Sequence, residues 1–112
     1  DCYFICAMDV NSDKLTSFSK AYNDKYGSMP GLAGTNAFFA YDAFLILKNA
    51  IEKAGVVDSV KIRDAIEATT NLQALTSTIT MDKNTHNPIR EATVFKIDNS
   101  KFVAVENYAI KK

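Results

Sequence analysis

One stretch, TNAFFAYDAFLILKNAIEKAG at positions 35–55, constrains the fold most. It reads as a helix of about five turns whose first half carries apolar side chains on every side and whose second half carries them on one stripe. Thr35 or Asn36 is suited to cap its start, and Gly55 stands where a helix commonly ends. A helix that is apolar all round has to be covered all round, and the remaining sequence offers few elements to do so. We therefore expect this helix to belong to a larger body or to pack against a second copy of itself.

Length and charge exclude several classes of protein. The 112 residues fit one small domain, and 13 basic residues balance 13 acidic ones, so nothing predicts a nucleic-acid partner. The sequence contains no apolar run long enough to predict a membrane-spanning helix. It opens directly on a strand-like run, DCYFI, with no lead-in, and we interpret this as the sign of a piece of a longer protein.

Cys2 and Cys6 are the only cysteines. On one strand they would share a face about 13 Å apart. A disulfide requires Cα atoms within roughly 7 Å, so they do not bridge each other. We expect both to be small buried core residues, with a disulfide between two copies as the alternative. Two cysteines and one histidine show no zinc-binding spacing, so we predict no metal site.

The first part of the chain predicts a strand followed by a helix. Positions 1–8 are almost continuously apolar, which is typical of a strand buried on both faces of a parallel sheet. Ser12 is suited to cap a helix at 14–26, with an apolar stripe that includes Phe18 and Tyr22. Gly27 ends this helix. Positions 28–34 hold two of the four glycines and predict a loop.

The second part predicts one more helix and then strands. Asp58 or Ser59 caps a helix at 60–69, which Asn71 closes in the left-handed conformation. The period then changes to two, which predicts a strand at 76–81, a polar loop at 82–88, and strands at 92–97 and 101–106 joined as a hairpin through 98–100. The opening strand has no evident sheet neighbour, and the closing strands need not supply one. We take this imbalance as the main structural sign of a fragment.

Few residues carry an indication of chemistry. His86 lies in the polar loop, and we expect it to be solvated, because nothing nearby in sequence would hold it as a base. Asp42 is a carboxylate in the first turns of an apolar helix; we expect a structural hydrogen bond to a neighbouring loop, with ligand contact as the alternative. The sequence holds no phosphate-binding glycine loop and no nucleophile motif, so we predict that the protein is not an enzyme and uses no cofactor.

Polar and aromatic side chains gather at the start of the central helix, beside the glycine-rich loop. They are Asn36, Phe38, Phe39 and Tyr41. A helix N-terminus with aromatic residues suits a small molecule that carries an anionic group. The alternative is that aromatic residues at helical spacing are simply core.

The motifs, taken in order, resemble a known family. They are K-Y-G-x-x-P at 25–30, A-Y-D-A at 40–43, A-I-E-K-A-G at 50–55, I-R-D-A-I at 62–66, and T-I-T-M-D followed by N-P-I-R within 78–90. Together with the final hairpin they look like the C-terminal third of a type I periplasmic binding protein, in the branch that serves ABC transporters of leucine, isoleucine, valine and related amides. The chain departs from the family where glycines are replaced, in 74–77, 84–87 and 98–100.

The resemblance implies an α/β fold: an incomplete type I periplasmic-binding-protein fold with two Rossmann-like lobes that close on a ligand. By analogy, 1–8 and 77–112 supply strands of the second lobe, and 14–70 supply helices of the first. The family's main contacts to the amino acid's ammonium and carboxylate groups would lie upstream of this chain. One wall of the site would remain here, formed by Asn36, Phe38, Phe39 and Tyr41, with Asp9 at the cleft edge.

The resemblance also implies a function. The chain would be a fragment of the substrate-binding component of an ABC transporter, binding a branched-chain or related amino acid for delivery to a membrane permease. We expect a periplasmic or extracellular location, and a lipid anchor at the cell surface if the organism is Gram-positive. The alternatives are a ligand-sensing receptor module of the same fold and a self-associating interaction domain. We also expect the isolated fragment to self-associate, because much of its helical surface is apolar.

Overall fold

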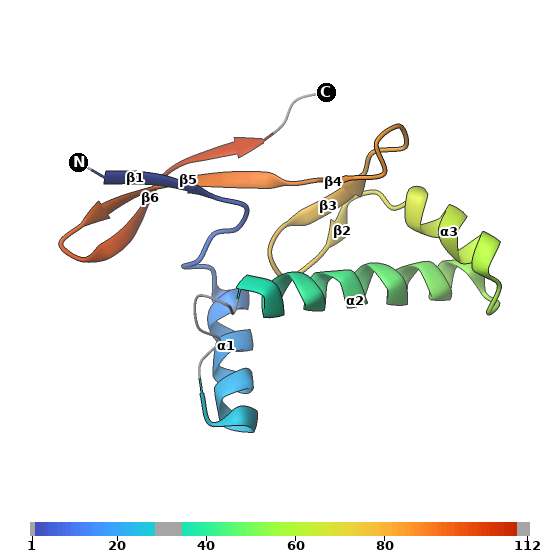
Figure 1. The fold of residues 1–112 in the computed structure, drawn as a ribbon, viewed down its shortest axis with the longest axis horizontal. Coiled ribbons are helices and arrows are strands. Elements are labelled where there is room, and N and C mark those ends of the chain that lie inside the picture. The colour runs from blue at the N-terminus through green and yellow to red at the C-terminus, as the bar shows by residue number, and fades with distance from the viewer. Residues whose placement is uncertain (1, 29–34, 110–112) are drawn as a thin grey trace.

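The computed structural model describes residues 2–28 and 35–109, and it is a mixed α/β fold with three helices and two small sheets (Figure 1). Along the chain the elements are β1 (Cys2–Cys6), α1 (Asp13–Tyr26), α2 (Thr35–Ala54), α3 (Ser59–Glu67), β2 (Leu72–Gln73), β3 (Thr78–Met81), β4 (Pro88–Ile89), β5 (Glu91–Asp98) and β6 (Lys101–Ala109). One sheet has the order β1-β5-β6 and the other the order β2-β3-β4. The body is flat and extended, 51 × 39 × 19 Å, so much of the described chain lies near solvent.

The helices begin and end where local signals predict. The Ser12 hydroxyl accepts a hydrogen bond from the backbone N–H of Leu15, 3.4 Å away, and Gly27 closes α1 with φ of +70°. Asp58 is the residue that caps α3, since its carboxylate accepts from the N–H of Lys61 at 2.9 Å. α3 ends at Glu67, two residues before the predicted boundary, and Asn71 has the expected positive φ of 50°.

The central helix, α2, runs to Ala54, and Gly55 follows it with φ of +66°. Gly55 N–H donates to the carbonyl of Ile51 at 3.0 Å, which satisfies one of the last carbonyls of the helix. The cap predicted at Thr35 or Asn36 stays a prediction. Of the predicted loop 28–34, positions 29–34 lie outside the described residues.

The prediction for the opening strand is wrong in two respects. β1 does have a sheet neighbour in its own chain, because it pairs antiparallel with β5, Phe4 opposite Phe95. It also lies at the edge of its sheet and is not buried on both faces: Tyr3 and Ile5 are 55% and 73% exposed. A run of apolar residues does not by itself distinguish a strand between two layers from an edge strand with one bare face.

The cysteines follow the strand that carries them. Cys2 is exposed and Cys6 half-buried, and both are free thiols, so the expected burial in a core is wrong for this chain. On the same face of their sheet, aromatic side chains pack against one another. Phe4 stacks on Phe95 with ring centroids 5.2 Å apart and meets Phe102 edge-on at 5.1 Å.

The second sheet contains two strands that the sequence did not reveal, β2 and β4, each of two residues. The predicted strand 76–81 is shorter, as β3 occupies only Thr78–Met81. The predicted hairpin between β5 and β6 is confirmed, with a two-residue turn of Asn99 and Ser100 at φ of 48° and 63°. Two positive φ values suit the right-handed twist of a hairpin, although serine adopts this conformation at a cost.

The core is small, and its residues come from α1, α2, β3, β5 and the loops between elements. The fully or almost fully buried apolar residues are Met8, Leu15, Ala50, Ala74, Ile79 and Phe95. In contrast, the side of α2 that carries Tyr41, Phe44 and Leu47 is 42–58% exposed. The described elements therefore leave the central helix partly uncovered, as its sequence predicts.

Candidate functional site

A buried polar cluster joins α2 to the sheets. Asp42 is fully buried, and its carboxylate accepts hydrogen bonds from the backbone N–H of Leu75, at 2.7 Å, and from the N–H of Thr76, at 3.3 and 3.4 Å. The hydroxyl of Thr76 donates to the same carboxylate. The expected structural hydrogen bond between Asp42 and a neighbouring loop is confirmed, because a carboxylate inside a protein needs such partners.

Arg90 completes this cluster. Its guanidinium Nη1 lies 3.7 Å from Asp42 Oδ2 and 3.3 Å from the Thr76 hydroxyl, and its side chain is 20% exposed. The guanidinium also lies over the ring of Phe39, 4.9 Å from the centroid. A fully buried carboxylate thus meets a largely buried cation, which makes this pair more strongly interacting than any surface pair of the described chain.

Of the predicted site residues, Phe38 faces α1. Its ring meets that of Phe18 edge-on at 5.5 Å, and it lines a small pocket of about 220 Å³ with Val10, Leu15, Thr16 and Ser19. Asp9 is the neighbour of Val10 in the turn that follows β1. Its backbone carbonyl and carboxylate accept hydrogen bonds from the N–H groups of Ser12 and Asn11, so it shapes that turn.

The other predicted residues point elsewhere, because positions 36, 38, 39 and 41 are spread around the circumference of a helix. Phe39 packs against Arg90. Tyr41 lines a larger aromatic groove of about 550 Å³ between α1 and α2, with Phe18, Tyr22 and Phe44 among its walls. Asn36 is exposed. The structure therefore brings Phe38 close to the turn that holds Asp9 but does not gather all five residues on one surface.

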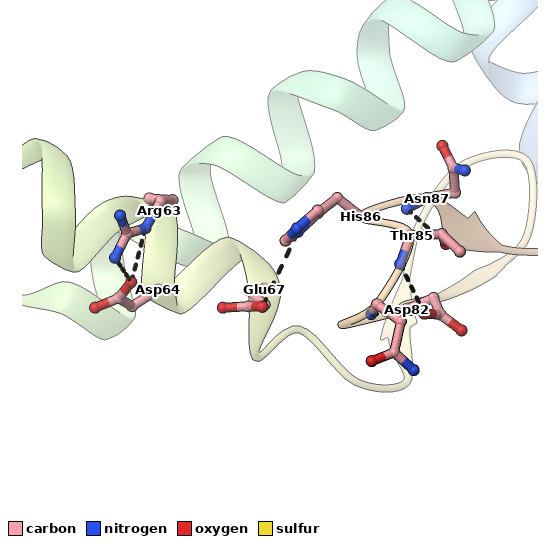
Figure 2. A network of polar contacts seen from close by, with 8 residues as sticks. Arg63, Asp64, Glu67, Asp82, Thr85, His86 and Asn87 are labelled. Carbon is pink, nitrogen blue, oxygen red and sulfur yellow. Dashed lines mark hydrogen bonds and ion pairs between the residues drawn. The ribbon is translucent and has the colours of Figure 1, made fainter.

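A third groove, of about 840 Å³, lies between α3 and the loop that joins β3 to β4 (Figure 2). Ile62, Ile66 and Met81 supply its apolar lining. His86 points across it toward Glu67, with Nδ1 4.0 Å from Oε1, and its side chain is 72% exposed, so the expected solvated histidine is confirmed.

Arg63 lies on the rim of this groove. The Asp64 carboxylate beside it, through a hydrogen bond and charge attraction, raises the pKa of the Arg63 guanidinium above its ordinary value. Both partners are exposed, so solvent screens the pair and it orders little beyond the two side chains.

Sequence reasoning missed Arg90 and Thr76. A signal for Arg90 was present, because this positive charge stands between the apolar Ile89 and the strand predicted at 92–97. The sequence carries no signal for Thr76 or for the pocket wall at Thr16 and Ser19. Most threonine and serine residues of proteins are exposed, so their presence does not indicate a buried site.

Within residues 2–28 and 35–109, no three histidine, cysteine or acidic side chains lie close enough together to hold a metal ion. None of the three described helices has the length and apolarity that a membrane crossing demands.

A family model described as periplasmic binding protein matches residues 4–101. Among solved structures, a leucine binding protein from Thermotoga maritima is 25% identical, with a TM-score of 0.69, and the match covers 96% of this chain but 30% of the other. A putative branched-chain amino acid ABC transporter protein from Rhodospirillum rubrum is 24% identical, with a TM-score of 0.77 over 92% of this chain and 30% of the other.

A solute binding protein of an ABC transporter from Rhodopseudomonas palustris, solved with 3,4-dihydroxybenzoic acid, has the same fold at 15% identity and a TM-score of 0.75. It is matched over 98% of this chain and 31% of its own. The chain therefore spans about 30% of the length of the solved structures that it matches. No curated protein sequence matches it.

Proposed function

Because the chain belongs to the periplasmic binding protein family, we propose that it is part of the solute-binding component of an ABC transporter and captures a small molecule without catalysing a reaction. The observation that carries this proposal is the match of the family model to residues 4–101, supported by solved relatives that share the fold over nearly all of this chain.

The arrangement of the elements supports the proposal that this chain contributes to both of two hinged lobes. The helices and the sheet β2-β3-β4 form one part of the chain, and the sheet β1-β5-β6 forms the other. Two connections cross between them: residues 7–12, and Arg90, the single residue between β4 and β5. We therefore assign β1, β5 and β6 to the second lobe. The boundary predicted at position 77 moves to Arg90 in this proposal, because β3 pairs with β2 and β4 pairs with β3, in the sheet that follows α3.

We propose a branched-chain or related amino acid as ligand, with one wall of its site in this chain. The pocket of about 220 Å³ beside Phe38 and Val10 is apolar on most sides and lies next to the first crossing, where two lobes would meet. Asn36, Phe38, Phe39, Tyr41 and Asp9 remain the proposed ligand-binding residues. Phe38 has the strongest support, because it is the one that lines a pocket near the crossing.

The relatives' transporters imply a membrane permease as partner, and a periplasmic or extracellular location follows from the family. A ligand-sensing module of the same fold uses the same closure and is the alternative. Both readings require the remaining two thirds of a typical relative to complete the binding site.

Calorimetry with leucine and with benzoate tests the proposal. We expect the 112-residue chain alone to bind neither ligand measurably, and the complete reading frame that contains it to bind leucine at micromolar concentration. Binding of benzoate but not of leucine would contradict an amino acid as ligand. In that longer protein, Phe38→Ala should weaken binding about tenfold or more, since burying a phenylalanine side chain contributes about 1.5–3 kcal/mol.

Phe44→Ala is the matched control, because Phe44 lies on the same helix but is 58% exposed. Equal losses in the two variants would remove Phe38 from the site. Micromolar leucine binding by the 112-residue chain alone would contradict the single-wall proposal.

A further inference from the structure

We propose that Arg90 is a positioning residue that fixes the angle between the two parts of the chain, by pinning the crossing between β4 and β5 to Asp42 of α2. The inference rests on the proposed function in one respect only: under that function the two parts belong to two lobes, and the angle is the angle between the lobes.

The position of Arg90 in the chain is the first argument. β4 ends at Ile89 and β5 begins at Glu91, yet the two strands belong to different sheets. The passage of the chain from one sheet to the other is therefore made at Arg90 alone. Where a single residue links strands of two different sheets, the sheets can swing about that residue unless its side chain is held.

The side chain is held from three directions. The guanidinium meets the Asp42 carboxylate at 3.7 Å, the Thr76 hydroxyl at 3.3 Å and the face of the Phe39 ring at 4.9 Å. Asp42 and Phe39 both lie on α2, and Thr76 lies in the loop that Asp42 fixes. The residue at the crossing is thus tied to the longest helix of the first part.

The charge and burial of the Arg90–Asp42 contact favour one orientation of the two parts of the chain. Asp42 is fully buried, and within the described residues Arg90 is the one cation at its carboxylate. Swinging β5 far from α2 would leave that carboxylate in a poorly solvated site with hydrogen bonds but without its counter-charge, which is strongly unfavourable. Small swings are absorbed by the flexible arginine stem, and large ones are not.

The first crossing is anchored differently. There the Asn11 side-chain amide donates to the backbone carbonyl of Phe102 at 3.0 Å, and Met8 is buried. These are a single neutral hydrogen bond and an apolar contact, and neither discriminates between orientations as an ion pair does. Removal of the Arg90 charge should therefore loosen the angle even though the first crossing is intact.

The test uses the full 112-residue chain. Electron–electron double resonance measures the distribution of distances between two spin labels, one on each part of the chain, and this distribution reports the angle between the parts. The background carries Cys2→Ser and Cys6→Ser, and the labels are attached at Lys53→Cys on α2 and Glu106→Cys on β6, both exposed positions. Dilution with unlabelled chain suppresses distances between copies. Circular dichroism of each variant reports whether the helices remain.

We expect one narrow distance distribution for Arg90, at least a twofold broader one for Arg90→Gln, and an intermediate width for Arg90→Lys, which keeps the charge but not the planar fork. Arg63→Gln is the matched control, because its ion pair with Asp64 is exposed, and it should leave the width unchanged. An unchanged width in a folded Arg90→Gln variant, or equal broadening by Arg63→Gln, would overturn the proposal.

Thr76→Val protects the test against a variant that fails to fold. It removes one partner of Arg90 at nearly constant volume, and we expect a width between those of the parent and Arg90→Gln. If Arg90→Gln unfolds and Thr76→Val leaves the width unchanged, the proposal is wrong. No ligand enters the measurement, so a chain that fails to support the proposed function by calorimetry still gives a readable answer about Arg90.

Discussion

At the scale of single residues, burial separates two ion pairs that have the same chemistry, an arginine with an aspartate. Asp42–Arg90 has a fully buried carboxylate and five donor contacts around it, whereas Arg63–Asp64 is open to water on both sides. An ion pair in water contributes little to stability. When one partner of a buried pair is removed, the other remains as a buried charge without compensation, which is strongly destabilising. The two aspartates should therefore respond very differently to the same substitution.

Asp42→Asn should lower the free energy of unfolding by about 2–4 kcal/mol, because the amide places a donor against backbone N–H groups and leaves Arg90 without its counter-charge. Urea titration followed by circular dichroism measures the change. Asp64→Asn is the control and should stay within about 0.5 kcal/mol of the parent. A loss for Asp42→Asn no larger than that of the control would contradict the role assigned to this carboxylate.

Ser100→Gly should raise the free energy of unfolding by about 0.5–1 kcal/mol, because Ser100 occupies a left-handed conformation with φ of 63°, which glycine adopts without steric cost. The same substitution in a helix, Ser17→Gly, should have the opposite sign and a similar size. Urea midpoints of the two variants decide the question, and a destabilised Ser100→Gly variant would show that the turn tolerates serine without strain.

At the scale of elements, the three helices were predicted because their signals are local. Ser12, Asp58, Gly27 and Gly55 act on neighbouring backbone groups, and their positions alone place most helix ends. β2 and β4 were missed because two residues show no period. The partner of β1 was missed because pairing with β5 connects opposite ends of the sequence, and no local pattern contains that information.

Less of the candidate site could be predicted. Aromatic residues at the start of α2 were correctly noticed, but their distribution over three different surfaces follows from the helix rotation and the position of α1. The burial of Asp42 could be predicted from its apolar helix. The arrival of Arg90 beside it could not, because that contact spans 48 positions between α2 and the crossing.

The cap of α1 provides a test at this scale. Ser12→Ala should lower the free energy of unfolding by about 1 kcal/mol, since the hydroxyl that accepts from Leu15 N–H is lost at the helix start. Ser17→Ala, inside the same helix, should be neutral or slightly stabilising. Thermal unfolding by circular dichroism compares the two. Equal effects would show that the start of α1 is fixed by packing of Leu15 alone.

At the scale of the whole molecule, the apolar surface exceeds what the described elements cover. Tyr3, Ile5 and Val103 share one bare face of the sheet β1-β5-β6, and both outer strands of that sheet are edges. α2 adds a second uncovered surface at Tyr41, Phe44 and Leu47. Apolar patches and open strand edges together favour association between copies.

We therefore expect the isolated chain to sediment above its 12.4 kDa monomer mass at micromolar concentration. The double variant Tyr3→Lys and Ile5→Lys should shift it toward the monomer, because charges on an edge strand oppose pairing. Val57→Lys, at a position that is 91% exposed outside the helices, is the control and should change nothing. A monodisperse monomer for the parent chain would contradict this prediction.

The antiparallel pairing of β1 with β5 has a consequence for synthesis on the ribosome. β1 cannot pair with β5 until the residues between the two strands have been translated, whereas α1, α2 and α3 are complete before β5 emerges. During that interval β1, with the apolar residues Tyr3 and Ile5, lacks its strand partner. Chaperones bind such exposed apolar segments. Slower translation should therefore lengthen the time in which β1 can associate with other chains.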